Sequence, residues 1–464
     1  AASSGCWRSR ATGHARRQPR TVAPARTMRE GECVTFLDAL RSRYEKGAVG
    51  AEGCRELAGR AGLSERDKEK QTNLELLERV VLQDANVAGG GEAGAIATAC
   101  PKIEELDLTG NPLAGWDATL GIARELPALR FFSLVRVALP PPPPAAIEGV
   151  GAALGALRTL VLNETGLSWA HACTICAQLP RLEELQLSDH TIDLDAEAEL
   201  QATRALPDVF PALRVLLLEN AGVRSWDDVW RLRDLPALEV LSLNANPIDR
   251  VRYVRADEAA GGANGAAAPF ATLQRLFLYE SQLSSWEDVD QCDQFPALRE
   301  LRLQDAPVVK GIGASVARQL IIARVGGIDA LNGATVSRRE REAAERFYLR
   351  QSIQHYPEPL PTPPAAEGEG GAAAEPQEPR LPEELGAVWA PFLKSNPRWR
   401  GLVGVHGMHS AQLPRTGGGG RTLAMSLVTL TLTSKAGESV DAKHTERKLP
   451  TSLTVAKLKL VCCQ

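Results

Sequence analysis

The stretch from Leu77 to Val308 repeats one apolar template, L-x-x-L-x-L-x-x-N-x-L, nine times. Successive copies begin 26, 26, 28, 25, 31, 25, 35 and 25 residues apart. A unit of this size cannot bury its own apolar face, so neighbouring units must stack against one another. The first apolar positions of the copies are Leu77, Ile103, Leu129, Leu157, Leu182, Leu213, Leu238, Leu273 and Leu298.

The copies that begin at Ile103 and Leu238 show the pattern most clearly. Apolar and polar residues alternate in their centres, which predicts a short strand with one buried face. Asn111 and Asn246 follow these strands, and a side-chain amide there can bond the backbone of the turn. The repeats are degenerate, because the same position elsewhere holds Val137, Thr165, His190 or Ala306.

The remainder of each period predicts a short helix. Ser225 and Ser285 each precede Trp and two acidic residues, which is typical of a helix N-cap. Leu-Pro or Phe-Pro pairs then end the helix, at 126–127, 179–180, 235–236 and 295–296. The sequence therefore predicts an α/β leucine-rich repeat solenoid of about nine repeats, with parallel strands on its concave face and helices outside.

Both ends of a solenoid need a cover, because the terminal core would otherwise meet water. Phe36 to Tyr44 has helical spacing and is predicted to cover the first end. At the other end, Gln319–Val325 and Ile328–Gly333 precede a charged helix that begins near Arg338. The predicted boundaries are an N-terminal helical cap region at 34–75, repeats at 76–312 and a C-terminal cap at 313–350.

Three further segments are predicted after the cap. Residues 351–395 are rich in Pro, Ala and Glu and are predicted to be a linker, and 396–424 a loosely ordered connector. In 425–464, Leu427–Leu432 alternates as a strand, 435–438 can turn and 445–450 can return. Thr451 or Ser452 would then cap a helix, an order that predicts the N-terminal half of a ubiquitin-like β-grasp domain.

The first 33 residues differ in composition from the rest. Residues 1–30 contain seven arginines and no acidic residue before Glu30. Such a leader resembles an organelle transit peptide. The other interpretation, which we favour from the sequence, is a disordered or wrongly assigned segment upstream of a true start at Met28.

Bulk properties exclude several classes of protein. The net charge of -4 favours neither nucleic acid nor an anionic membrane as a partner. No apolar run approaches the roughly 18 residues of a membrane span. The nine cysteines are scattered without framework spacing, which is typical of reduced thiols in the cytosol.

No catalytic motif is evident. Cys173 and Cys176 have redox or half-zinc spacing, but no second pair follows and the surrounding apolar residues predict a helix with buried thiols. His406 and His409 are predicted to lie in a solvated loop rather than to bind a metal. The Gly runs at 89–91 and 417–420 lack the strand and helix of a phosphate-binding loop. We expect no enzyme, no cofactor and no metal.

The predicted binding surface is the concave face, where aromatic, apolar and arginine side chains alternate with the buried leucines. Aromatic residues beside arginine dominate the energetics of protein interfaces, so the strongest candidates lie near residue 277. The alternative is that these aromatic residues pack against each other or against the insertion at 251–269. The candidates are Phe277, Tyr279, Arg275, Arg302, Leu217, Val215, Val240, Phe131, Glu105 and Asp107. Trp226 and Trp286, at equivalent positions of two repeats, are predicted to pack helices.

The ordered combination of segments resembles the tubulin-folding cofactor E family over roughly residues 34–464. The resemblance is carried by Phe36–Tyr44, the Ala99–Thr109 and Leu160–Trp169 repeat segments, the cap, Phe392–Trp399 and the ubiquitin-like half. It implies a cytoplasmic chaperone, associated with the microtubule cytoskeleton, that binds α-tubulin. It also implies that cofactors D, C and B are partners in assembling or dissociating the αβ-tubulin heterodimer.

Two departures from the family pattern bear on this function. No CAP-Gly motif of the G-x-N-D-G type is present, and the ubiquitin-like segment lacks its last strands. We expect a fragment or truncated form, or else an isoform without the module that reads the tubulin tail. Two other functions stay open: a generic leucine-rich repeat adaptor, such as a phosphatase-regulator-like scaffold, and an organelle-imported regulator.

Overall fold

A computed structural model describes residues 33–45, 73–192, 194, 205–254, 268–358 and 385–407, and the backbone of 427–433 and 444–450. The chain divides into two compact units, residues 1–338 and 339–464. The boundary falls inside the stretch predicted as a C-terminal cap at 313–350. Each unit is described by itself.

In the described part of the first unit, one sheet of eleven strands runs in the order β13-β12-β11-β10-β9-β8-β7-β6-β5-β4-β2. All neighbours pair in parallel except β12 and β13. Each of the nine predicted repeats contributes one strand of three residues, and the central residue of each repeat strand is no more than 2% exposed. The repeat strands are β2 Arg79–Val81, β4 Glu105–Asp107, β5 Phe131–Ser133, β6 Thr159–Val161, β7 Glu184–Gln186, β8 Val215–Leu217, β9 Val240–Ser242, β10 Arg275–Phe277 and β11 Glu300–Arg302.

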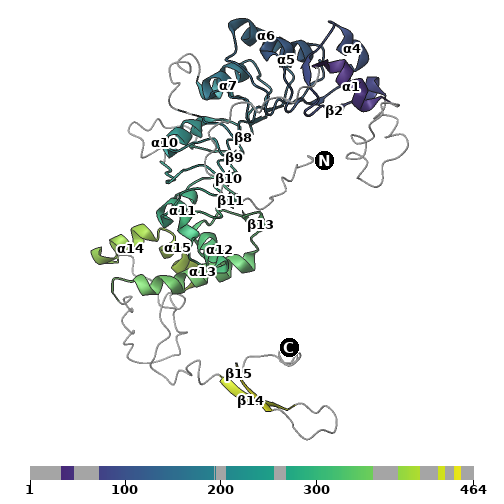
Figure 1. Cartoon of the computed structure of the whole chain (residues 1–464). Coiled ribbons are helices and arrows are strands. Elements are labelled where there is room, and N and C mark those ends of the chain that lie inside the picture. The colour runs from purple at the N-terminus through teal and green to yellow at the C-terminus, as the bar shows by residue number, and fades with distance from the viewer. Residues whose placement is uncertain are drawn as a thin grey trace, which may run out of the picture. The chain divides into compact units, whose positions relative to one another are not determined.

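Helices and short helical turns cover the other face of the sheet, and the strands lie along the inner side of the curve (Figure 1). The fold is therefore an α/β solenoid, as the repeat period in the sequence predicts. The covering elements are η1 Leu74–Leu76, α4 Ala95–Ala99, α5 Gly115–Arg124, α6 Pro144–Leu154, α7 Trp169–Cys176, α9 Leu206–Val209, α10 Trp226–Val229, η2 Trp230–Asp234, α11 Trp286–Cys292 and η3 Pro307–Val309.

The chain turns out of the sheet in the same way after each repeat strand. The residue five positions after the first strand residue has a positive φ, between 48° and 71°. Left-handed backbone at this point lets the chain leave the strand and start towards the helix side. These residues are Asp84, Gly110, Arg136, Glu164, Asp189, Asn220, Ala245, Glu280 and Asp305.

The asparagines predicted to hold the turn do so. Asn246 accepts hydrogen bonds from the backbone N–H of Ala221 and Val223, both at 3.0 Å. Its side-chain amide also donates to the carbonyls of Leu218 and Leu243. Asn111 makes the same four kinds of bond at the equivalent position of the second repeat. A single buried side chain thus satisfies the backbone of two adjacent repeats.

The predicted helix at the first end is α1, Phe36–Tyr44, preceded by β1 Val34–Thr35, which pairs with β3 Val87–Gly89. Thr35 caps the helix by accepting from the N–H of Asp38. Tyr44 is buried, and its hydroxyl accepts from the N–H of Val81 at 2.9 Å. The open edge of β2 is therefore covered by a side chain, as a terminal repeat requires.

At the other end, α12 Ala314–Arg324 precedes the pair β12 Ala330–Leu331 and β13 Ala334–Thr335. Because β13 runs antiparallel to β12, it ends the parallel ladder. Asp290 of α11 and Arg324 of α12 form a buried ion pair at 2.7 Å. The last repeat helix is thus fastened to the cap.

The second unit corrects the predicted linker and connector. Helix α13 spans Arg338–Ser352, followed by η4 Ile353–His355, η5 Ala387–Trp389, α14 Ala390–Ser395 and α15 Trp399–His406. Residues 387–395 and 399–406 are therefore helical, where the sequence predicts a linker to 395 and a loose connector from 396.

These helices form around an aromatic cluster. Trp389 and Trp399 are fully buried and stack at 5.8 Å, and Tyr356 contacts both rings. Phe392 meets these three rings edge-on at 5.2–5.5 Å. Large aromatic residues bury enough surface to hold short helices that have little stability alone.

Strands β14 Leu427–Thr433 and β15 His444–Pro450 pair in antiparallel register, with Leu427 opposite Pro450. The pairing agrees with the predicted strand and return, and the predicted turn at 435–438 lies outside the described residues. The predicted helix at 455–461 lies outside the described residues, so the ubiquitin-like assignment stays a prediction.

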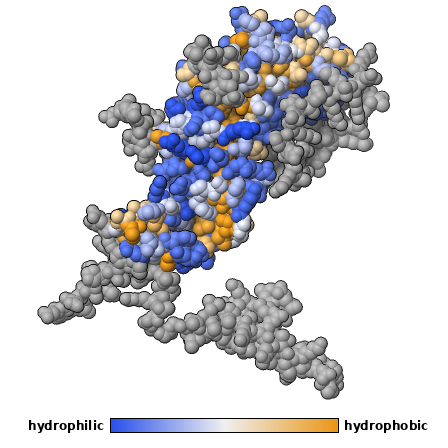
Figure 2. Space-filling view, turned by 60° about the vertical axis from the view of Figure 1, so that its left-hand side comes forward, coloured by the Kyte–Doolittle hydropathy of each residue, from blue (hydrophilic) through white to orange (hydrophobic). Residues whose placement is uncertain are grey.

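On the face shown in Figure 2, hydrophilic residues cover much of the repeat unit and apolar residues form narrower patches between them. Within the described residues, no helix combines the length and apolar character that crossing a membrane requires.

Candidate protein-binding surface

Each repeat strand has three residues, of which the central one is buried. The concave face is defined here by the first and third residues of each repeat strand, together with the residue two positions after the strand ends. Strand register aligns them into rows that cross the solenoid. One row runs Glu105, Phe131, Thr159, Glu184, Val215, Val240, Arg275 and Glu300. Side chains in one row lie about 4.8 Å from their neighbours along it, so residues far apart in sequence meet there.

The register brings seven of the predicted residues together on β8 to β11 and the turns after them. Val215 and Val240 are adjacent, and Val240 also lies next to Arg275. Leu217 and Phe277 lie on either side of Ser242. An apolar area is therefore followed directly by an aromatic and cationic one. The remaining three predicted residues, Glu105, Asp107 and Phe131, lie on β4 and β5, beyond β6 and β7.

Phe277 is less accessible than predicted, because it is only 8% exposed. The guanidinium of Arg302 lies over its ring, with 4.0 Å between the guanidinium carbon and the ring centroid. Arg302 is held there by Glu300, which accepts from its Nε at 3.1 Å. The alternating pattern predicts the face that Phe277 occupies, but its cover comes from the neighbouring repeat.

Tyr279 follows β10 and is half-buried. Its backbone N–H donates to Asn244 Oδ1 at 3.0 Å, and its hydroxyl interacts with two carboxylates. The hydrogen bond with Glu280, with smaller contributions from burial and Asp305, raises the pKa of Tyr279 to about 12. The phenol therefore stays protonated over a wider pH range than that of an ordinary tyrosine.

Glu219, on the turn after β8, organises the polar part of this area. Its Oε1 accepts from Ser242 Oγ at 2.6 Å and from Asn244 Nδ2 at 2.9 Å. Since Asn244 also bonds the backbone of Tyr279, a continuous network joins three repeats. Such networks fix side chains before a partner arrives, which lowers the entropy lost on binding.

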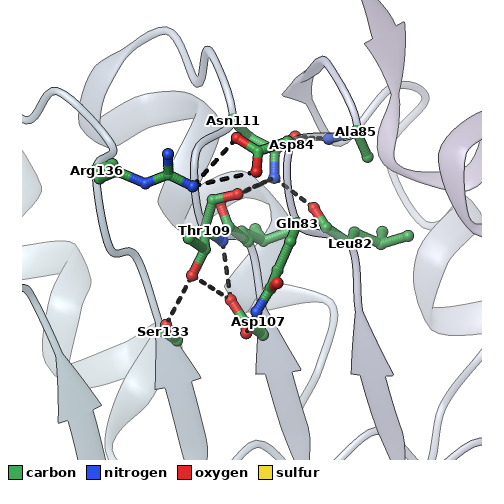
Figure 3. Close-up of polar contacts among 10 residues, drawn as sticks. Leu82, Gln83, Asp84, Ala85, Asp107, Thr109, Asn111, Ser133 and Arg136 are labelled. Atoms are coloured by element: carbon green, nitrogen blue, oxygen red, sulfur yellow. Dashed lines mark hydrogen bonds and ion pairs between the residues drawn. The ribbon is translucent and has the colours of Figure 1, made fainter. Parts of the chain in front are cut away.

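The acids of the first repeats are engaged within the face itself. Glu105 pairs with Arg79 at 3.3 Å. Asp107 accepts from Gln83 Nε2 at 2.6 Å and from Thr109, whose hydroxyl is also 3.3 Å from Ser133 (Figure 3). Their carboxylates are thus already engaged, Glu105 in an ion pair and Asp107 in hydrogen bonds, and this end of the face is suited to holding repeats together.

The described part of the insertion lies on the helix side. Tyr253 is buried against Trp230, Phe295 and the carbonyl of Pro269. Trp226 donates to the carbonyl of Arg252 at 2.6 Å, which agrees with its predicted packing role. Residues 251–254 therefore do not cover Phe277 and Tyr279, and residues 255–267 are outside the description.

The cysteine and histidine pairs noted in the sequence show no sign of a metal or redox site among the described residues. Cys173 and Cys176 lie in α7 and are buried, as predicted, and burial raises the pKa of the Cys176 thiol. His406 corrects the prediction of a solvated loop: it ends α15, its side chain is 3% exposed, and its Nε2 lies 2.7 Å from Glu345. His409 lies outside the described residues. Among those described, no three His, Cys, Asp or Glu side chains gather in a way that could hold a metal.

Two residues that organise the face, Glu219 and Glu300, are outward positions of their repeats in the sequence but are not among the ten candidates. Glu300 precedes Arg302 by two positions and therefore shares its face. Glu219 stands where the register places it beside Asn244. Aligning the repeats position by position would identify both residues, because each acid then lies beside an arginine or an asparagine on the same face.

Parallel strands, left-handed turns and short outer helices define a leucine-rich repeat protein, and its concave face carries mixed aromatic, aliphatic and charged residues. A chain of the Drosophila melanogaster SNF/U2A′ complex matches 37% of this chain and 87% of its own length at 18% identity, with a TM-score of 0.28. The fold assignment rests on the strand register. No protein-family model matches the chain.

Curated relatives identify the family that the chain resembles. Tubulin-folding cofactor E of Arabidopsis thaliana is 26% identical over 439 residues, which are 92% of this chain and 75% of the relative. Tubulin-specific chaperone E of Homo sapiens is 29% identical over 84% of this chain and 67% of the relative. A tubulin-specific chaperone cofactor E-like protein of Rattus norvegicus is 30% identical over 62% of this chain and 64% of the relative. These matches confirm the predicted resemblance: the chain is a relative of the tubulin-folding cofactor E proteins.

Proposed function

We propose that this chain is a tubulin-folding cofactor of the cytoplasm that binds α-tubulin through the concave face of its repeats. In this role it acts with cofactors D, C and B in assembling or dissociating the αβ-tubulin heterodimer. The names of the relatives support the link to tubulin. No step requires catalysis by this chain.

The observation that carries the proposal is the grouping of Val215, Leu217, Tyr279 and Arg302 on the neighbouring strands β8, β10 and β11 and the turn after β10. Aliphatic and aromatic groups beside an arginine are the residue types that dominate interface energies. A tubulin subunit that has not yet met its partner exposes apolar surface, and a curved face of this composition can cover part of it.

The test is binding of the full chain to purified αβ-tubulin, with a Leu217→Asp, Tyr279→Asp double variant. Phe277 is left unchanged, because an aspartate at a buried position would confuse unfolding with loss of binding. We expect the wild type to retain tubulin and the double variant to lose it. A matched control, Ala145→Asp on the exposed side of α6, should bind normally.

Absence of binding by the folded wild type would contradict the proposal and favour the alternative of a leucine-rich repeat adaptor with another partner. Normal binding by the double variant would remove the concave face from the proposal. Capture of cofactor D together with tubulin tests the proposed joint action.

A further inference from the structure

Arg302 is held in a single orientation on the concave face. Its guanidinium stacks on the ring of Phe277 at 4.0 Å, and its Nε donates to Glu300 at 3.1 Å. An arginine on a surface strand ordinarily samples many rotamers, and fixing it costs entropy when it binds. Here the ring and the carboxylate fix the plane of the guanidinium in advance.

The donors that remain are those a carboxylate needs. Among the residues that the structure describes, Glu300 alone pairs with Arg302, and it takes Nε. Both Nη nitrogens are therefore available, and the side chain of Arg302 is 43% exposed. Arg214 provides the contrast, because Glu239 accepts from both its Nε and its Nη2.

The charges around Arg302 give the direction from which an anion can approach. Arg275 is exposed on the adjacent strand, in register with Glu300, so a second arginine stands in the row next to the residue that pairs with Arg302. Glu280 and Asp305 lie beyond the strand ends and interact with the hydroxyl of Tyr279. An anion is repelled at that rim and attracted over the strands.

We propose that Arg302, with Arg275 beside it, is a binding point for an aspartate or glutamate side chain on the surface of the bound protein. The inference rests on the proposed function and adds the chemistry of the contact. A planar guanidinium bonds a carboxylate through two parallel N–H···O bonds, which a lysine cannot reproduce. The ring of Phe277 keeps the planar guanidinium in place and removes part of its hydration.

The experiment measures the Kd of purified αβ-tubulin for the full chain carrying Arg302→Lys, Arg302→Gln or Phe277→Leu, at two salt concentrations. We expect at least tenfold weaker binding for both Arg302 variants, because charge without the planar geometry is insufficient. Phe277→Leu should weaken binding less. The wild type should lose affinity with added salt more steeply than Arg302→Gln.

Arg214→Gln is the matched control, since its guanidinium is already occupied, and it should bind as the wild type does. Thermal unfolding identifies any variant that fails to fold, and Arg302→Lys keeps the aliphatic cover over Phe277. Wild-type affinity in Arg302→Lys would overturn the proposed carboxylate contact while leaving the proposed function standing. A wild type that does not bind tubulin would overturn the proposed function itself.

Discussion

Asp84 and Arg136 are separated by 52 residues in the sequence and form an ion pair at 3.1 Å across Gly110 (Figure 3). The three residues occupy the same turn position in consecutive repeats. Strands two apart are separated by about 10 Å, so the side chains meet only if the turn between them carries none. A Cβ on Gly110 would collide with Asp84 Oδ1 and crowd Arg136. This glycine therefore leaves room for a bond between non-adjacent repeats.

Gly110→Ala is expected to destabilise the solenoid by more than the backbone strain of a non-glycine residue alone would. A non-glycine residue at φ +71° costs about 1 kcal/mol, and loss of an exposed ion pair adds up to about 1 kcal/mol. Gly222→Ala is the control, because φ there is +72° and the nearest atom, on Thr191, is 3.7 Å away. Chemical unfolding of both variants gives the difference, which an Asp84→Ala background should abolish. Equal losses in the original background would show that the ion pair contributes nothing.

Removing the amide of Asn246 is expected to cost about 3 kcal/mol in the free energy of unfolding. Asn246 is 1% exposed, and Asn246→Ala leaves two backbone N–H groups and two carbonyls without this partner. Asn220→Ala serves as comparison, because Asn220 is exposed and donates to Asp189 at the surface. Its effect should stay below about 1 kcal/mol. A similar small effect for Asn246→Ala would mean that water replaces the amide.

The sequence predicts the first unit well because its signals are local and repeated. Alternation over five residues places Leu106 and Leu241 in the core, and the serines at 225 and 285 cap their helices as expected. Repetition lets one pattern confirm another. The cover over Phe277 was missed, because Arg302 lies in the next repeat and its rotamer depends on Glu300.

The helix α13 follows the sequence prediction, whereas α14 and α15 do not, for a different reason. The helix α14 spans six residues and α15 eight, too few for a clear apolar period. Their stability comes from Tyr356, which is more than thirty residues upstream of Trp389 and contacts its ring at 5.0 Å. The intervening Pro, Ala and Glu composition predicts a linker, and composition alone does not reveal which residues pack across it.

Tyr44→Phe is expected to loosen the first edge of the sheet. The variant keeps the buried ring but removes the hydroxyl that accepts from the N–H of Val81. A backbone donor left without a protein partner costs about 1–2 kcal/mol, so amide exchange at Val81 should become faster. Tyr348→Phe is the control, because the hydroxyl of Tyr348 donates to Asn396 in the second unit. Unchanged exchange at Val81 would mean that the edge does not depend on this bond.

The buried pair of Asp290 and Arg324 provides a pH-dependent link between the last repeat and its cap. Their side chains are 6% and 11% exposed, and both carboxylate oxygens accept from Arg324 Nη1. Burial disfavours the charged carboxyl more than Arg324 favours it, which raises the pKa of Asp290 from 3.8 to about 6. Arg324 also lies over the ring of Trp286 at 5.1 Å, so the cation has a second neighbour.

Because the folded protein binds this proton more tightly than the unfolded chain, the contribution of Asp290 to stability is fully present below about pH 4. It is lost as the pH rises through about 6. At about 1.4 kcal/mol per pKa unit, the change approaches roughly 3 kcal/mol. The measurement is the free energy of unfolding of wild type and Asp290→Asn from pH 4 to 7.5, where the wild type should lose stability relative to the variant.

Asp227→Asn, on the exposed side of α10, is the control for this titration and should follow the wild type at every pH. A constant offset between wild type and Asp290→Asn would mean that Asp290 keeps one charge state throughout, with Arg324 outweighing burial. In that case the cap would be held by a permanent ion pair, and removing either partner would cost about 3–5 kcal/mol at all pH values, since the other charge would remain buried.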